Sequence, residues 1–302
     1  MSIEVRQLRY AVMTADKRSF ARAAQALNTK QSTLSKKVAE LEIRLGIKLF
    51  ERTTNGASPT EAAKTFLATA RRIVTDVDNL VTTAKNMRYG QQGRLAIGYS
   101  SPLIGGNLHA SIGDYLNRYK DVQFDAVEKD PADLLNGLQL RTLDAAIVAA
   151  DLSSAEIKQA FLWSERLLLA LPESHALAGN ERVHWSDLKR EPIVLPQNGM
   201  GVAIARQLAS RMMDQGLRTN TLFQEASHET ILNTVQFSRF ATVVPDSMRG
   251  VPWPGVIFKE VHDAIGQAHL DFSVYWHEDN ENGALKYFFR LLKERYPSIN
   301  LG

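Results

Sequence analysis

The stretch "SFARAAQALNTKQSTLSKKVAELE", residues 19–42, holds two apolar patterns separated by six polar residues. The first pattern repeats at helical spacing behind Ser19, a good N-cap, and consists of Phe20, Ala23, Ala24 and Leu27. The second predicts a helix that ends near Gly46 and buries Leu34, Val38, Leu41 and Leu45. Residues 28–30 are typical of a short turn. A helix that only filled a core would not begin with polar residues, so we expect them to meet something outside the protein.

The first turn of the second helix carries side chains that donate to phosphates or read base edges. They are Gln31, Ser32, Thr33, Ser35, Lys36 and Lys37. An upstream helix over residues 4–16 would complete the core with Leu8, Val12 and Ala15. The pattern predicts a helix-turn-helix whose second helix enters the major groove of double-stranded DNA.

A hairpin is predicted directly after these helices. In "KLFERTTNGASPT", residues 48–60, Asn55-Gly56 is a strong hairpin signal, and Lys48 and Arg52 flank it. Residues 1–60 contain 11 Lys and Arg against 5 Asp and Glu, whereas residues 61–302 contain 25 against 28. A basic head on a slightly acidic body favours a polyanionic partner, although a solvated basic face would explain the charge equally well.

Residues 1–63 closely resemble the winged helix-turn-helix of LysR-type transcriptional regulators. The matching residues are "SF-RAA--LN", "QS-LS--V--LE--LG--LFER" and "PTEA". The resemblance implies that the bases are faced by Gln31, Ser32, Ser35 and Lys36, and that Arg52 in the wing contacts the phosphate backbone. Three positions depart from the family pattern, namely Lys30 at the N-cap, Pro59 and Ala63.

Residues 60–89 contain no Pro or Gly and predict one long helix. A heptad seam runs along it through Phe66, Ala70, Ile73, Val77, Leu80, Ala84 and Met87, widened by Leu67, Val74 and Val81. The helix could pack only on its own domain, but its length favours dimerisation, and the resemblance implies a linker helix that pairs two regulators. "GQQG", residues 90–93, is a natural hinge.

The remainder of the chain alternates between strand and helix patterns in two cycles, which predicts parallel sheets covered by helices. The strands are expected at 94–100, 122–128, 144–150, 166–172, 192–196, 221–226 and 240–245. We expect an α/β effector domain of two subdomains, similar to periplasmic binding proteins, with a cleft between them. The expected organisation is a DNA-binding domain at 1–59, a linker helix at 60–89, subdomain I at 90–164 and 269–302, and subdomain II at 165–268.

Six polar residues follow the ends of predicted strands and are candidates for effector binding. They are Ser100, Ser101, Gln197, Asn198, Ser227 and His228. N-caps and turns would also account for them. Because hydroxyls and free N–H groups converge where a strand ends and a helix begins, we expect a small anionic or carbonyl-bearing effector, such as a carboxylate.

Several function classes are disfavoured by what the sequence lacks. The chain has no cysteine, which excludes disulfides and thiol-based redox sensing. No apolar run approaches the ~20 residues that span a bilayer, and the charged N-terminus is unlike a signal peptide, so we expect a cytoplasmic protein. No nucleotide, nucleophile-elbow or metal-ligand motif occurs, so neither cofactor nor metal is expected.

The favoured function is therefore a DNA-binding transcription regulator controlled by a small molecule. It would act as a homodimer or homotetramer, with RNA polymerase as a further partner. A solute-binding protein or an α/β enzyme is the alternative, and an architectural DNA binder would leave the large second half without a role.

Overall fold

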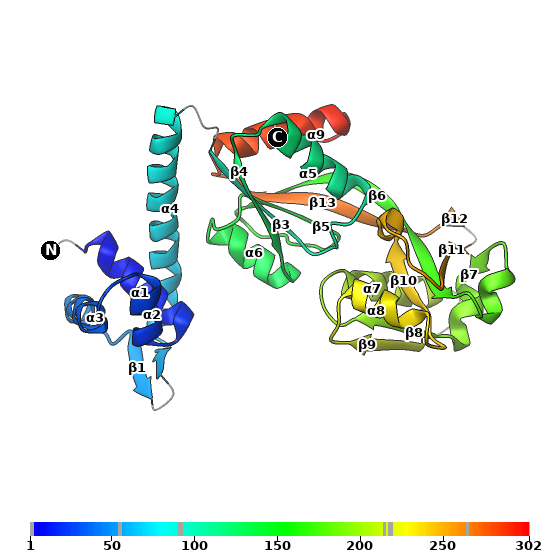
Figure 1. The fold of residues 1–302 in the computed structure, drawn as a ribbon, viewed down its shortest axis with the longest axis horizontal. Coiled ribbons are helices and arrows are strands. Elements are labelled where there is room, and N and C mark those ends of the chain that lie inside the picture. Colours follow the sequence, from blue (N-terminus) through cyan, green and yellow to red (C-terminus); the bar gives the residue numbers. More distant parts are fainter. Residues whose placement is uncertain are drawn as a thin grey trace. The chain divides into compact units, whose positions relative to one another are not determined.

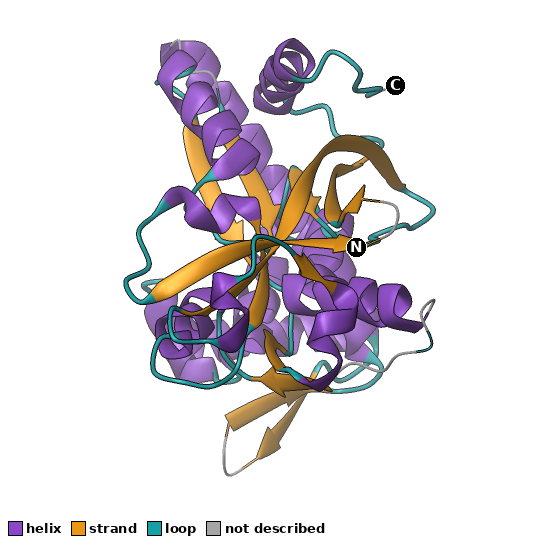
Figure 2. Ribbon diagram, turned by 90° about the vertical axis from the view of Figure 1, so that its right-hand side faces the viewer, coloured by secondary structure: helices purple, strands orange, loops and turns teal. Residues whose placement is uncertain are grey.

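The computed structural model describes residues 3–53, 56–89, 93–213, 216, 220–263 and 266–301. The chain divides into two compact units, one formed by the residues up to 91 and the other by nearly all those that follow. Each unit has its own hydrophobic core. Figure 1 traces both units along the sequence, and Figure 2 separates their helices from their strands by colour.

The N-terminal unit consists of three short helices, a hairpin and one long helix (Figure 1). In order these are α1 (Val5–Lys17), α2 (Phe20–Ala26), α3 (Gln31–Leu45), β1 (Phe50–Thr53), β2 (Gly56–Pro59) and α4 (Ala63–Tyr89). Ala23 and Ala24 are buried in α2, where their small side chains let neighbouring helices approach closely. The three apolar residues Leu34, Val38 and Leu41 fix which face of α3 is buried.

The predicted helix ends are confirmed. The Ser19 hydroxyl accepts the backbone N–H of Arg22 at 3.4 Å, and Gly46 ends α3 in the left-handed region at φ 69°. Lys30 occupies the N-cap of α3 but makes no side-chain cap hydrogen bond, because an ammonium group cannot accept one. The turn between α2 and α3 places Asn28 at φ 49°, a conformation that Asn tolerates better than most residues.

Glu42 joins the end of α3 to the hairpin. Its Oε1 accepts the backbone N–H groups of Leu49 at 2.7 Å and Phe50 at 3.2 Å. Gly56 lies so close to α1 that a Cβ there would stand 2.3 Å from the carbonyl oxygen of Arg18. The hairpin is therefore held at both ends. Asn55, part of its sequence signal, lies outside the described residues.

The long helix α4 has two different apolar faces. Leu67, Ala70 and Val74 are buried within the N-terminal unit, whereas Ile73 and Leu80 are 40% and 69% exposed. The Thr60 hydroxyl accepts the N–H of Ala63 at 3.2 Å, so Thr60 caps the helix. The heptad pattern therefore splits, with one part packed on its own unit and the other facing outward. The side chains of Ala84 and Met87 lie outside the described set.

The C-terminal unit has two lobes, and the first is built on a parallel sheet. Its strands β3 (Arg94–Tyr99), β4 (Gln123–Glu128) and β5 (Ala145–Val148) pair in parallel, with β13 (His269–His277) antiparallel to β5. Helices α5 (Gly106–Arg118) and α9 (Gly283–Arg295) cover one face, and α6 (Pro131–Gln139) covers the other (Figure 1). Successive residues of β3 alternate between these two cores.

The second lobe repeats this layering. β8 (Pro192–Pro196) pairs in parallel with β9 (Asn220–Gln224), while β10 (Thr242–Pro245) and β11 (Val256–Asp263) pair with β6 (Ile157–Pro172). α7 (Met200–Met213) covers one face and α8 (His228–Val235) the other. The short strands β7 (Val183–His184) and β12 (Gly266–Gln267) pair with β11, and 3₁₀ turns lie at Ala176–Gly179, Trp185–Arg190 and Asp246–Gly250.

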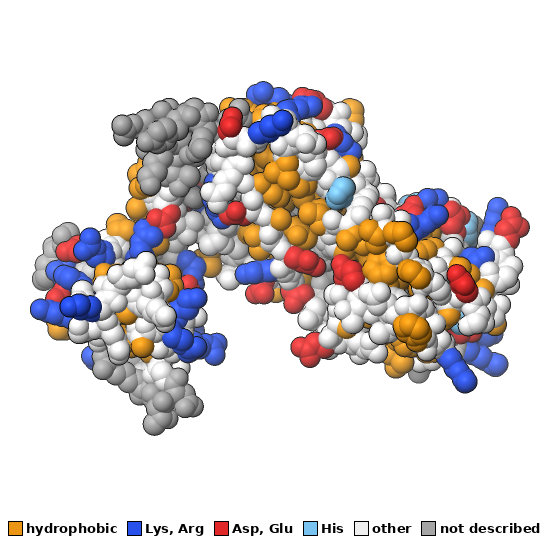
Figure 3. All heavy atoms as spheres, in the orientation of Figure 1, with side chains coloured by type: hydrophobic (Ala, Val, Ile, Leu, Met, Phe, Trp, Pro, Cys, Tyr) orange, Lys and Arg blue, Asp and Glu red, His pale blue; other side chains and the backbone are white. Residues whose placement is uncertain are grey.

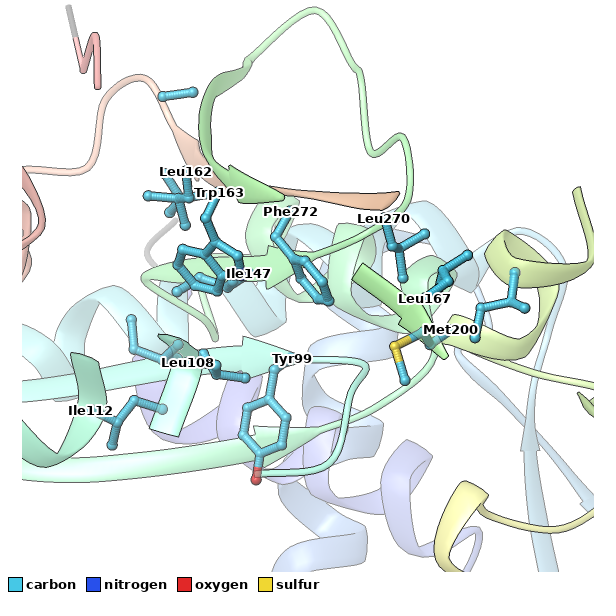
Figure 4. Close-up of a cluster of buried hydrophobic side chains, with 14 of the residues drawn as sticks. Tyr99, Leu108, Ile112, Ile147, Leu162, Trp163, Leu167, Met200, Leu270 and Phe272 are labelled. Carbon is cyan, nitrogen blue, oxygen red and sulfur yellow. The ribbon is translucent and has the colours of Figure 1, made fainter. Parts of the chain in front are cut away.

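One long strand, β6 (Ile157–Pro172), belongs to both lobes. Its residues up to Arg166 pair with β13, and those from Leu167 to Pro172 pair with β10 and β11, antiparallel in each case. The prediction of parallel sheets was therefore wrong for these central strands. Figure 4 shows the hydrophobic core where β6 passes from one lobe to the other. Trp163 and Phe272 lie between Leu108 and Ile112 of α5 and Met200 of α7.

Candidate functional site

The exposed start of α3 forms the candidate DNA-binding surface. Gln31, Ser32, Thr33 and Lys36 are exposed, and Ser35 and Lys37 are half-buried. Because Leu34 and Val38 are anchored in the core, the orientation of this polar face is fixed by packing. Figure 3 shows Lys and Arg side chains distributed over the N-terminal unit that carries it.

The cations of this surface differ in the ion pairs that they form within the protein. Lys37 binds Glu40 at 2.9 Å one turn along α3, and Lys48 binds Glu42 at 3.2 Å. Lys36 is exposed near the start of the same helix. The side chain of Arg52, the predicted backbone contact in the wing, lies outside the described set.

Arg22, an exposed cation in the first turn of α2, was missed by the sequence reasoning. Lys30, noted in the sequence as a departure from the family pattern at the N-cap, is also exposed and precedes Gln31. Helix N-termini and the cations near them are common phosphate contacts. The excess of basic residues in the first 60 positions was the sequence signal that could have indicated further phosphate contacts.

A pocket of about 230 Å³ lies between the two lobes of the C-terminal unit. The first lobe lines it with Ser100 and with residues 128–130, which end β4 and lead into α6. The second lobe contributes Asn198, Gly199 and residues 227–229, at the starts of α7 and α8. Strand ends and helix starts from both lobes therefore converge on one small cavity.

Four of the six predicted effector residues line this pocket, namely Ser100, Asn198, Ser227 and His228. Ser101 and Gln197 do not. Ser101 is only 5% exposed and lies in the bend that follows β3, buried beside the core. Gln197 is exposed, and its backbone N–H continues the β8–β9 ladder by donating to the Gln224 carbonyl oxygen at 2.9 Å.

His228 is the most unusual of the four. It is 5% exposed, and its Nε2 is buried without a hydrogen-bond partner. Burial lowers the pKa of His228 to about 4, so the imidazole is neutral near pH 7. Ser227, by contrast, also serves as an N-cap, since its Oγ accepts the N–H of Thr230 at 3.2 Å.

Three carboxylates also line the pocket and were missed by the sequence reasoning. Glu128 and Asp130 come from the first lobe and Glu229 from the second, against a single cation, Lys129. Burial, together with the charge of Glu229, raises the pKa of Glu128. Nothing in the local sequence indicated this, because the two glutamates belong to different lobes and meet only in the fold.

Two larger cavities of the C-terminal unit are weaker candidates for an effector site. One of about 580 Å³ beside α7 is lined by Asp151, Arg206, the end of β5 and several residues along β13, and one of about 410 Å³ lies where β6 passes from one lobe to the other. In the second, Arg166 is already paired with Asp246 and Glu260. Neither lining includes a buried polar atom that lacks a partner among the described residues.

Comparison with known families decides the identity. Residues 88–297 match the family described as the LysR substrate binding domain, and residues 5–64 match the bacterial regulatory helix-turn-helix protein, lysR family. The chain belongs to the LysR family of transcriptional regulators. LysR regulators combine a DNA-binding head with a ligand-binding domain, so this chain is a DNA-binding transcription regulator with an effector-binding domain.

Full-length LysR relatives support this assignment. The chain is 30% identical over 254 residues to the uncharacterized HTH-type transcriptional regulator YnfL of Escherichia coli (strain K12), covering 83% of this chain and 85% of that protein. It is 24% identical to the HTH-type transcriptional regulator AlsR of Bacillus subtilis (strain 168), covering 96% and 95%. A hydrogen peroxide-inducible genes activator of Dickeya chrysanthemi is 30% identical, over 80% of this chain and 79% of that protein.

Solved LysR structures share the fold. The crystal structure of CbnR, a LysR family transcriptional regulator, superposes with a TM-score of 0.79 at 19% identity and covers 97% of this chain and 99% of its own. Full-length CbnR complexed with its target DNA gives a TM-score of 0.76 at 20% identity, over 97% and 99%. In the part of this LysR chain that the structure describes, no helix is long and apolar enough to cross a membrane.

Proposed function

We propose that the polar first turn of α3 reads operator DNA in the major groove. Gln31, Ser32, Thr33 and Ser35 would meet base edges. Lys37 and Arg52 would neutralise phosphates, and so would Lys36, although the family resemblance turns it toward the bases, because an ammonium group is a cation. The observation that supports this most directly is the anchoring of α3. Leu34, Val38 and Leu41 are at most 1% exposed, so the polar face cannot rotate away from a bound duplex.

A second copy of the chain would cover the outward face of α4. Ile73, Leu80 and Val81 are exposed apolar residues on this helix, and Ile73 also lines an apolar groove of about 280 Å³ with Val5 and Phe66. Burial of such a surface against the same surface of another copy gives a dimer with two DNA heads.

The corresponding parts of the chain are the head at 1–59, the linker helix at 60–89, and effector subdomains at 90–164 with 269–302 and at 165–268.

The 230 Å³ pocket between the lobes would hold the effector. The observation that carries this proposal is that polar residues of both lobes line one cavity, among them His228, whose buried Nε2 lacks a partner. A buried polar group without a partner is costly, and a ligand that hydrogen-bonds to it removes that cost. Because such a ligand touches both lobes, it favours one closure of the cleft and shifts the population of states.

The remaining features follow from this role. The regulator would work in the cytoplasm, where its operator lies, as a homodimer or homotetramer, and would affect transcription through contacts with RNA polymerase. It would act by binding alone, without catalysing a reaction. The names of its relatives differ, so they do not fix the effector. Thiol oxidation is not its signal, since the chain contains no cysteine.

Two matched substitutions in the full-length protein would test the proposed pocket. We expect His228→Ala and Asn198→Ala to abolish the response of operator binding to the effector while leaving effector-free operator affinity unchanged. Gln197→Ala and Ser101→Ala are the controls, because neither residue lines the pocket. Loss of response in the control variants, with a normal response in the pocket variants, would place the effector elsewhere.

A further inference from the structure

The pocket between the lobes is acidic. Glu128, Asp130 and Glu229 supply three negative charges and Lys129 one positive charge. His228 adds none, because burial keeps it neutral near pH 7. The anionic effector that the sequence suggested would therefore be repelled by the net negative charge of the pocket lining.

The two glutamates come from opposite sides of the pocket. Glu128 ends β4 in the first lobe, and Glu229 lies in the first turn of α8 in the second. Both residues line the same cavity, and burial, together with the charge of Glu229, raises the pKa of Glu128. Like charges facing each other across a cleft oppose its closure. A positive charge between them would turn this repulsion into attraction on both sides.

Three helices begin at the pocket, and two of them, α6 and α8, have acidic side chains at their start, whereas the first turn of α7 has none. The positive end of α8 already faces Glu229 in its first turn, and the Ser227 hydroxyl accepts one of its free N–H groups. Asp130 likewise directly precedes α6, whose first turn also holds Asp133. The positive N-terminal ends of α6 and α8 therefore already have acidic side chains of the protein beside them before any ligand enters.

A metal ion is a poor occupant of this acidic pocket. Within the described ranges, no group of three or more His, Asp or Glu side chains is arranged to hold a metal. The pocket lining also includes residues suited to an organic molecule: Ser100 with its hydroxyl, Asn198 with its amide, and His228, a largely buried imidazole whose Nε2 lacks a partner. Its volume, about 230 Å³, is below the range of about 300–1,000 Å³ typical of sites for drug-sized ligands.

We propose that the effector is a small organic cation, bearing an ammonium or amidinium group, that bridges Glu128 and Glu229 and hydrogen-bonds to His228. This inference rests on the proposed function, because it names the ligand class of the proposed effector pocket. It also gives the cation a mechanical role: it removes the repulsion between the two lobes, so it stabilises the closed cleft more than the open one.

A series of four-carbon probes tests the charge preference on one frame. We would titrate the full-length protein by calorimetry, up to 10 mM, with 1,4-diaminobutane, 4-amino-1-butanol, 1,4-butanediol and succinate. Affinity should rise with positive charge, by about fivefold or more for each charge added, and should fall as salt is raised. Equal affinities across the series, tighter binding of succinate, or no binding by either amine would overturn the inference.

Matched variants tie the preference to the two glutamates. Glu128→Gln and Glu229→Gln should each weaken diamine binding about tenfold, whereas Glu181→Gln, which removes an exposed charge outside the pocket lining, should not. Diamine binding that is unchanged in both pocket variants would also overturn it. If succinate binds instead and Asn198→Ala abolishes that binding, the pocket remains an effector site and only the cationic class is wrong.

Discussion

Gly199 of the second lobe lies directly against Ser100 of the first: a Cβ at position 199 would stand 3.3 Å from the Ser100 carbonyl oxygen. Gly199 also has φ +57°, a conformation that other residues rarely adopt. Both residues line the pocket. The glycine therefore serves two needs at once, because it turns the chain into α7 and lets the lobes approach beside the proposed ligand.

Gly199→Ala should destabilise the protein and hinder closure of the cleft. We expect a loss of about 1–2 kcal/mol from the left-handed backbone alone, and a further loss from crowding against Ser100. Gly216→Ala is the matched control, since Gly216 has φ +69° but nothing within 4 Å of an added Cβ. Chemical denaturation of both variants would measure the difference. Equal losses would show that the contact with Ser100 does not matter.

The DNA-binding unit was the most predictable part of the fold. Local signals decide it: the spacing of Leu34, Val38 and Leu41, the cap at Ser19 and the left-handed Gly46. The first half of β6 was missed because Ile157–Glu165 lacks a regular alternation of apolar and polar residues. That strand is defined by its partners in both lobes, and such long-range pairing leaves little trace in a local pattern.

The effector pocket was only partly predictable for the same reason. Strand ends and helix starts indicated Ser100, Asn198 and His228, because parallel strands end at one edge of a sheet. The facing of Glu128 and Glu229 depends on how the two lobes are joined. Whether His228 Nε2 has a hydrogen-bond partner depends on every neighbour of that atom. The pattern of a single sequence contains neither the arrangement of the lobes nor the neighbours of one atom.

The cations and the amide of α3 should have separable effects on DNA binding. Lys36→Ala should weaken binding to matched and scrambled operators alike and reduce the salt dependence, because ammonium groups neutralise phosphates. Gln31→Ala should cost about 1–3 kcal/mol on the matched operator and little on the scrambled one. Fluorescence anisotropy on both DNAs would measure this. Equal losses for Gln31→Ala on the two DNAs would remove it from base reading.

Lys37→Ala provides an internal comparison within α3. Its ammonium group is already bound to Glu40 at 2.9 Å, whereas Lys36 is exposed. We therefore expect Lys37→Ala to weaken DNA binding less than Lys36→Ala in the same anisotropy assay. A larger loss for Lys37→Ala would mean that DNA displaces Glu40 from this pair.

Charges on the outward face of α4 should dissociate the dimer. Ile73→Asp with Leu80→Asp would bury two unpaired charges at the proposed interface, which is strongly unfavourable. Arg72→Asp is the control, because it places the same new charge at an exposed position on the same helix. Sedimentation would report the mass of each variant. A double variant that keeps the mass of the wild type would show that α4 does not pair the chains.

The burial of His228 should make stability depend on pH. Its folded pKa, about 4, is below its unfolded value of 6.5, so unfolding binds a proton between these values. Stability from this group is complete above pH 6.5 and is lost as pH falls toward 4, by up to about 3 kcal/mol.

The matching variant for this pH dependence is His228→Gln, which should flatten the slope of the unfolding free energy between pH 6.5 and 4. Glu128 acts in the opposite direction because its pKa is raised in the fold, so the informative quantity is the difference between variant and wild type. Denaturant unfolding at several pH values gives that difference. Identical slopes in the two proteins would indicate that His228 is protonated in the folded state or reaches water.

Selection of genomic DNA fragments by the full-length protein tests the central claim most directly. We predict that the wild type enriches a small set of fragments with two similar half-sites related by approximate two-fold symmetry. Gln31→Ala should lose this enrichment while still retaining bulk DNA at low salt. A wild-type protein that enriches no fragment over bulk DNA would contradict the account.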